Sequence, residues 1–194
     1  MRKMRFLLAA SVLCLGAALS AAAAGPAASV YTEKGLFTVS FPEGWVRAET
    51  GLGLSSEEKK VYGAELAGPE SSGIAVRIGV HYYAPGNLLQ PTAKGFIKLH
   101  SRPALGVDPD DGVYGNVKAS KVGNYRAEVF DRTTYVYVPP DAMNPKKVPV
   151  YERFAVVPVR RGFYVLRYYA PKETAERYLP AFEAVLSSFR MLKR

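Results

Sequence analysis

The chain has 194 residues, with 26 Lys or Arg against 17 Asp or Glu, and a single cysteine. One cysteine excludes an internal disulfide framework, and the length suits one domain with a core of its own. The positive charge is spread along the sequence, so nucleic acid is not predicted as a partner, whereas acidic protein surfaces and anionic lipid headgroups are plausible ones.

The first 24 residues (1–24) have the pattern of a secretory signal peptide. Three basic residues and no acid come first, an apolar run follows at residues 6–19, and small residues continue to Ala24. We predict cleavage after Ala24, which removes Cys14 and with it any thiol nucleophile or cysteine ligand. The alternative is an uncleaved signal that anchors the protein, because residues 6–24 approach the roughly 20 apolar residues that span a bilayer.

Cleavage after the signal leaves residues 25–194 as one predicted domain, with an ordered core of about 30–191. We expect this domain in the periplasm or outside the cell, with no stable membrane span of its own. Its oligomeric state is open.

The mature chain is expected to consist of short strands separated by turns, with two helical stretches. Strands are predicted at 36–41, 61–67 and 74–83, and the last two form a hairpin. Residues 51–60 are predicted to be a polar loop. A helix is predicted over residues 93–101 with Thr92 as its N-cap.

The second half of the chain continues this pattern. Strands are predicted at 113–122, 125–138, 150–159 and 163–170, with a long loop at 139–147. The region 172–191 is helical, and Pro180 is predicted to begin a second helix within it, because an interior proline disrupts a helix. Short turns between successive strands favour a mainly antiparallel sheet. The predicted fold class is α+β, with helices packed on a central sheet.

Two segments carry a family resemblance. Residues 35–45 read GLFTVSFPEGW, and residues 162–166 and 182–189 read GFYVL and FEAVLSSF. They are similar to the opening strand and turn, and to the last strand and closing helix, of the Mog/PsbP-like superfamily. The resemblance implies a central antiparallel sheet covered by helices, in a non-enzymatic module that docks on other proteins. Both segments look structural, so they carry over no binding residues.

No catalytic, cofactor or metal motif is complete in this sequence. There is no G-x-S-x-G elbow, residues 51–56 lack the lysine of a phosphate loop, and residues 108–112 lack the closing glutamate of a calcium loop. We therefore predict no enzyme, no cofactor and no metal site. His100, near the end of the first helix, is expected to meet the negative end of that helix.

A candidate binding surface comes from alternation along two strands. Arg77, His81 and Tyr83 lie on the polar face of the strand at 74–83, and Arg126 and Arg132 lie on the polar face of the long strand at 125–138, taken as its neighbour. If the two faces coincide, these five residues form a surface suited to anionic groups, because guanidinium groups bind carboxylate or phosphate bidentately. The alternative is ordinary salt bridging under a covering helix.

These observations predict an exported, non-catalytic binding or assembly module that docks on an envelope protein or an anionic surface. One alternative is a hydrolase built from His81 or His100 with a carboxylate. Another is a carrier that holds a small apolar molecule between sheet and helix.

Overall fold

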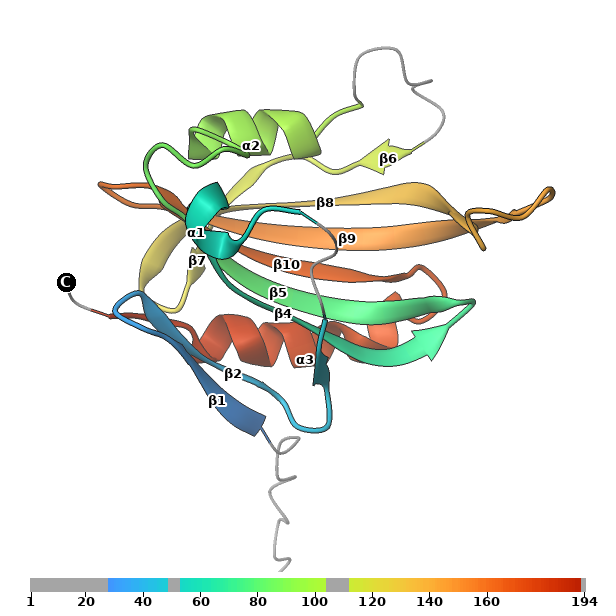
Figure 1. The fold of residues 1–194 in the computed structure, drawn as a ribbon, viewed down its shortest axis with the longest axis horizontal. Coiled ribbons are helices and arrows are strands. Elements are labelled where there is room, and N and C mark those ends of the chain that lie inside the picture. Colours follow the sequence, from blue (N-terminus) through green and yellow to red (C-terminus); the bar gives the residue numbers. More distant parts are fainter. Residues whose placement is uncertain (1–27, 49–52, 104–111, 193–194) are drawn as a thin grey trace, which may run out of the picture.

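Antiparallel strands make up most of the fold in the computed structural model, which describes residues 28–48, 53–103 and 112–192 (Figure 1). The strands are β1 (Ala28–Glu33), β2 (Phe37–Pro42), β3 (Val46–Arg47), β4 (Val61–Ser71), β5 (Ile74–Tyr83), β6 (Val113–Tyr114), β7 (Lys118–Val122), β8 (Tyr125–Val138), β9 (Lys146–Pro158), β10 (Phe163–Pro171) and β11 (Arg190–Met191). The helices are α1 (Ser56–Lys59), α2 (Ala93–His100) and α3 (Ala175–Ser188). The predicted signal peptide and residues 108–111 lie outside the described residues.

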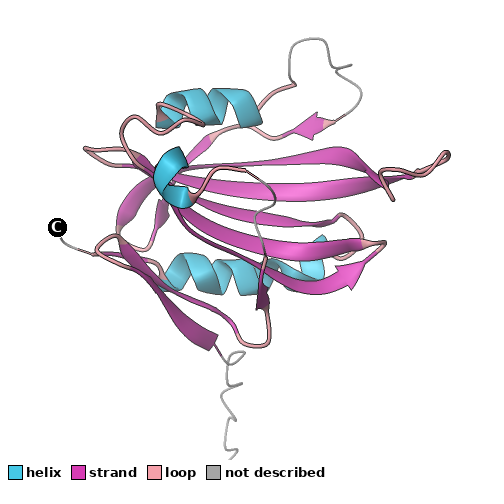
Figure 2. Ribbon diagram, in the orientation of Figure 1, coloured by secondary structure: helices cyan, strands magenta, loops and turns pink. Residues whose placement is uncertain are grey.

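The strands form two sheets. The large sheet has the order β3-β4-β5-β10-β9-β8-β6, with β7 also paired to β8, and the small sheet has the order β1-β2-β11. Every pairing among the described strands is antiparallel. The predicted α+β class with a mainly antiparallel central sheet is therefore confirmed (Figure 2).

The main core lies between one face of the large sheet, helix α3 and the small sheet. Strand β2 alternates strictly, so that Phe37, Val39 and Phe41 are all buried on one side. Helix α3 contributes Phe182 to the same cluster, and its C-cap residue Phe189 belongs to it too. Because β2 and α3 pack on each other, the small sheet and the C-terminal helix together form one layer that covers this face of the large sheet.

A second, smaller apolar cluster lies on the opposite face of the large sheet. Phe96 and Ile97 of α2 pack there on Phe130, Phe154 and Phe163. Thr92 is the N-cap of α2, as predicted, since its Oγ1 accepts a hydrogen bond from the backbone N–H of Gly95 at 3.0 Å. Helix α2 covers only part of this face, and the rest carries polar side chains together with a small apolar cluster around Val148 and Val150.

Several predicted boundaries were wrong. The stretch 113–122 is two strands, β6 and β7, and β9 begins at Lys146, inside the predicted loop at 139–147. Strands β1, β3 and β11 were not predicted, because each is short or has little alternation. The predicted loop at 51–60 contains helix α1, which a capping box starts: Ser55 and Glu58 bond each other's backbone N–H groups.

The predicted break at Pro180 is also wrong. Pro180 lies inside the continuous helix α3, and its side chain is exposed. Phe182 and Val185 of the same helix are completely buried against the sheet. Their packing keeps the helix in one piece although proline removes one backbone hydrogen bond.

Candidate functional site

Backbone pairing puts all five candidate residues on one face of the large sheet. Directly paired residues share a face, and one row of pairs crosses five strands through Gly63, His81, Val165, Val156 and Glu128. Residues an even number of positions from this row share its face: Arg77, His81, Tyr83, Arg126 and Arg132. We call it the polar face. The expectation that β5 and β8 are neighbours is wrong, because β10 and β9 lie between them.

A chain of alternating charges crosses the polar face. Arg77 Nη1 lies 3.3 Å from Glu65 Oε1, and Arg167 Nη1 lies 3.8 Å from the other oxygen of Glu65. Arg167 Nη2 lies 2.6 Å from Glu152 Oε1, and Arg132 Nε lies 2.5 Å from Glu152 Oε2. These five residues come from five adjacent strands, and we call them the ion chain. It holds three positive charges against two negative ones.

Glu152 is the most buried member of the ion chain, at 1% exposed. Burial alone would raise the pKa of its carboxyl, but Arg167 and Arg132 together outweigh burial and hold that pKa below its usual value. The guanidinium carbons of Arg132 and Arg167 also lie 5.4 and 5.9 Å from the ring centre of Phe154. Contacts on two sides therefore fix the position of both arginines.

Ordinary salt bridging accounts for much of the predicted surface. The positive charge of Arg132 is paired with Glu152, and only 18% of the Arg132 side chain is exposed. Arg77 is different, because 47% of its side chain is exposed although it contacts Glu65. Of these two candidates, Arg77 alone presents much of its guanidinium group to a partner.

A cavity of about 170 Å³ opens on the polar face beside the ion chain. Gly63, which is paired with His81, lines it. Gly63 has φ +141°, and a Cβ there would lie 2.0 Å from the carbonyl oxygen of Val80. The charged and polar side chains that line the cavity are those of Arg47, Ser56, Lys59, Glu65, His81 and Tyr83.

His81 is neutral at ordinary pH. Burial lowers the pKa of its imidazole to about 4; Glu65 opposes the shift, and the cations Arg167, Lys59 and Arg47 reinforce it. The formal charges on the cavity wall are therefore Arg47 and Lys59 against Glu65. This arrangement can hold a small anionic group, with a neutral imidazole as an additional hydrogen-bond partner.

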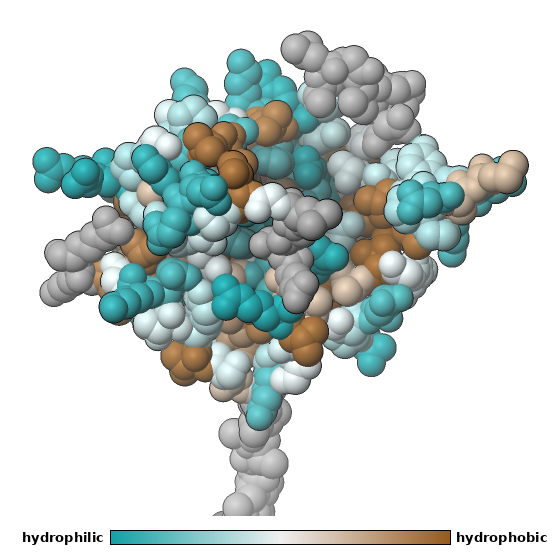
Figure 3. Space-filling model, viewed as in Figure 1, coloured by the Kyte–Doolittle hydropathy of each residue, from teal (hydrophilic) through white to brown (hydrophobic). Residues whose placement is uncertain are grey.

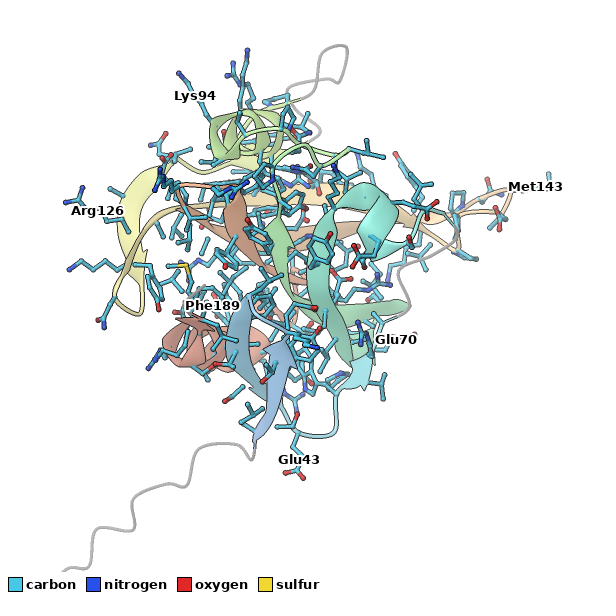
Figure 4. All side chains as sticks on the ribbon, turned by 60° about the vertical axis from the view of Figure 1, so that its left-hand side comes forward. Glu43, Glu70, Lys94, Arg126, Met143 and Phe189 are labelled. Carbon is cyan, nitrogen blue, oxygen red and sulfur yellow. The ribbon has the colours of Figure 1, made fainter. Side chains whose placement is uncertain are left out.

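The other two candidates lie differently. Tyr83 stacks on Phe163, with ring centres 4.7 Å apart, and meets Phe96 edge-on, so it closes the cavity toward the apolar cluster under α2. Arg126 is exposed at the margin of the sheet, as Figure 4 shows, and takes no part in the ion chain. The structure thus brings Arg77, His81, Tyr83 and Arg132 around one stretch of the polar face and leaves Arg126 apart.

The expectation for His100 is wrong. Its ring lies 4.2 Å from the ring centre of Phe96 and 5.4 Å from that of Phe154, and burial lowers its pKa to about 4. A neutral imidazole carries no charge to offer the negative end of α2. Its buried Nδ1 has no hydrogen-bond partner among the described residues.

Sequence reasoning missed most of the ion chain. Glu152 and Arg167 are charged residues in strands that are mostly apolar and that bury both faces. Their sequence neighbours are apolar or aromatic, except Arg153 next to Glu152. A buried charge needs a partner of opposite sign, and this signal could have predicted that the two residues meet. Arg47 and Lys59 come from a short edge strand and from α1, and no periodic pattern marks them.

Comparison with known proteins gives a likeness of fold. No protein-family model matches the chain, and no curated protein sequence matches it. The solution structure of cyanobacterial PsbP from Synechocystis sp. PCC 6803 aligns over 91% of this chain and 98% of its own, with a TM-score of 0.49 and 12% identity. A PsbP structure is thus among the structural neighbours, as the two sequence segments predict.

Two further solved structures are similar. LpqN, involved in cell envelope biogenesis of Mycobacterium tuberculosis, aligns over 87% of each chain with a TM-score of 0.41 and 15% identity. A protein of unknown function from Pseudomonas aeruginosa, PA94, aligns over 86% of this chain and 97% of its own, with a TM-score of 0.42 and 7% identity. At these identities the likeness to PsbP and to both other proteins concerns the fold alone.

The described part of the chain contains no helix that is both long and apolar enough to cross a membrane. The apolar run predicted to be a signal peptide lies outside it.

Proposed function

We propose that this chain is an exported, non-catalytic binding module whose polar face accepts an anionic group of an envelope protein. The observation that carries the proposal is the cavity beside the ion chain, where Arg47 and Lys59 line the wall and the exposed edge of Arg77 lies close by along the sheet. A carboxylate there would meet Arg47, whose Nη2 already donates to the carbonyl of Gly63 at 3.3 Å, so less ordering of that side chain would be needed on binding.

The ion chain supports this proposal because it fixes the guanidinium groups. Arg167 reaches both Glu65 and Glu152, and so joins the cavity wall to the buried centre of the sheet. Rigid arginines bind carboxylates with less loss of side-chain freedom than mobile ones. The ion chain has one more positive than negative charge, which favours an anionic partner over a cationic one.

One structural observation supports each of the two alternatives, the hydrolase and the carrier. Ser56, Glu65 and His81 line the same cavity, which is what a hydrolase would need. A hollow of about 360 Å³ beside the start of α3, lined in part by Tyr151 and Leu179, is where a small apolar molecule would be carried. Hydrolysis of ester, phosphate or peptide substrates that disappears in His81→Gln would favour the enzyme over the binding module.

The test compares two charge reversals in affinity capture from the envelope fraction of the protein's own host. Arg77→Glu places a negative charge at the exposed edge of the ion chain. Arg177→Glu makes the same change on α3, which packs on the other face of the sheet. We expect wild-type protein and Arg177→Glu to retain one dominant partner, and Arg77→Glu to lose it by a factor of ten or more, since a like charge opposed to an anion costs over about 1.4 kcal/mol.

The salt dependence of capture sharpens this comparison. The captured partner should be released at moderate salt, because partly exposed ion pairs are screened. Equal capture by wild-type protein and Arg77→Glu, at equal thermal stability, would exclude the polar face as the binding surface. Capture of no protein by any variant would favour the hydrolase or the carrier.

A further inference from the structure

Four segments that are distant in sequence meet at one end of the molecule, on the left in Figure 1. The backbone N–H of Met191 in β11 donates to Tyr125 Oη at the start of β8, at 3.1 Å. The next N–H, that of Leu192, donates at 2.9 Å to the carbonyl of Leu36 in the β1–β2 turn. Arg161, in the β9–β10 turn, shares a hollow with Met191 and Leu192. The β1–β2, β7–β8 and β9–β10 turns and strand β11 therefore lie together.

These four segments carry six exposed basic residues, which we call the basic end: Lys34, Lys121, Arg126, Arg160, Arg161 and Arg190. Within the described part of the chain, none of the six forms an ion pair. The acids nearest to them in the sequence are Glu33, which accepts a hydrogen bond from Tyr31, and Glu128. The basic end is thus strongly positive, and Figure 3 shows hydrophilic side chains projecting at the same left margin.

A cross-strand pairing brings two of these charges together, and two hydrogen bonds hold a third in place. Lys121 and Arg126 are directly opposite each other on β7 and β8, a like-charged pair that costs stability without an anion between or above it. Arg190 Nη1 donates to the carbonyls of Ser187 and Phe189 at 2.7 and 2.8 Å, which fixes the guanidinium beside the β7–β8 turn. Neither contact neutralises the positive charge.

We propose that the basic end is a contact surface for the anionic phospholipid headgroups of a membrane. Its charges come from separate turns spread across the width of the molecule, which suits a laterally extended anionic surface better than a single carboxylate. A hollow of about 380 Å³ with apolar walls that include Val159 and Met191 lies directly beside Arg160 and Arg161, as an amphipathic lipid would require.

This proposal shares with the proposed function only the exported location of the chain. The ion chain and the cavity at His81 contribute nothing to it. Arg126 lies on the polar face, but it takes no part in the ion chain and is paired with Lys121, so it belongs to the basic end. Failure of one surface therefore leaves the other untouched.

The experiment measures co-flotation with lipid vesicles, using protein purified from its host so that it carries the N-terminus that the cell leaves. Vesicles of phosphatidylcholine alone are compared with vesicles that also contain phosphatidylglycerol. Each basic side chain near an anionic membrane contributes about fivefold to binding, so the double variant Arg160→Gln/Arg161→Gln should bind roughly 25-fold more weakly to the anionic vesicles. Wild-type binding should fall as salt rises.

The matched control is Lys146→Gln/Lys172→Gln, which removes the same charge from two exposed positions at the opposite end of β9. It should bind the anionic vesicles within about twofold of wild type, since about a Debye length or more separates it from the surface. Equal weakening by both double variants would overturn the proposal, as would wild-type binding that is the same with and without phosphatidylglycerol. Loss of a captured protein, with no vesicle binding at all, would assign the basic end to a protein partner instead.

Discussion

Glu152 binds two arginines from two different strands while almost completely excluded from water. A carboxylate in that position is stable only because Arg132 and Arg167 approach it from both sides. The same contacts leave neither arginine free to rotate. At the scale of single residues, the polar face is therefore a rigid arrangement of charges with exposed groups only at its edges.

We predict that Glu152→Gln destabilises the protein by about 1–3 kcal/mol. The change leaves two cations beside each other without their carboxylate, and the cost stays below the about 3–5 kcal/mol of a fully buried pair because Arg167 is 35% exposed. Urea denaturation at neutral pH measures the effect. Glu128→Gln, an exposed acid on the neighbouring strand β8, is the control and should stay within about 0.5 kcal/mol of wild type. Equal stability of the two variants would contradict the importance of the ion chain.

The two histidines predict how stability depends on pH. Burial lowers the pKa of His81 and of His100 to about 4, below the ordinary 6.5 that each has when unfolded. Between these values the unfolded chain binds more protons than the folded one, so stability is fully present above about pH 6.5 and falls as the pH drops toward 4. From pH 7.5 to pH 5 we expect a loss of about 1–2 kcal/mol for each histidine.

Denaturation midpoints at these two pH values test this prediction. His81→Gln and His100→Gln should each remove their own share of the loss, and the double variant should show little pH dependence in this window. The pKa of Glu152 lies below its usual value, so its contribution disappears only at lower pH. A double variant that loses as much stability as wild type would show that other groups cause the pH dependence.

At the scale of elements, the sequence predicts those strands that alternate regularly or are continuously apolar. Strand β5 has the bounds expected from its pattern, and β8 also matches, because each strand has a clear turn at one end. The two-residue strands β3 and β11 could not be predicted, since they exist only through pairing with β4 and β2. Tertiary contacts, not local preference, decide such elements.

The site shows the same division. Alternation placed Arg77, His81 and Tyr83 correctly on the polar face, because side-chain direction in a strand is a local property. Their partners could not be found, because strand order decides which charges meet, and β10 and β9 lie between β5 and β8. Gly63 is a clearer case: its importance comes from a backbone conformation and a pairing that no sequence pattern marks.

At the scale of the whole molecule, the charges separate into two regions. The polar face carries a nearly balanced network, whereas the basic end carries an unpaired excess. The first suits recognition of a particular anionic group, and the second suits attraction to an extended surface. The two together would bring the chain to a membrane and leave the face with the cavity free for a partner.

The predicted export is tested by the mass of the protein recovered from its host. We expect an N-terminus at Gly25 in the envelope or extracellular fraction, and replacement of Ala24 by a bulky residue should leave the 21.2 kDa precursor uncut, because signal peptidase requires a small residue there. A full-length wild-type protein in the membrane fraction would favour the anchored alternative.

The pairing of β2 with β11, and the packing of α3 on β2, would have a consequence for the predicted export of the protein. Phe37 and Phe41 are buried in the same cluster as Phe182 and Phe189, which come from the C-terminal end of the chain. A chain that crosses a membrane with its N-terminus first presents β2 long before these partners emerge. If the chain is exported as predicted, this core could not form before the C-terminal part had been made, so the precursor would stay unfolded enough to cross the membrane. Folding would then be completed by the last segment to arrive.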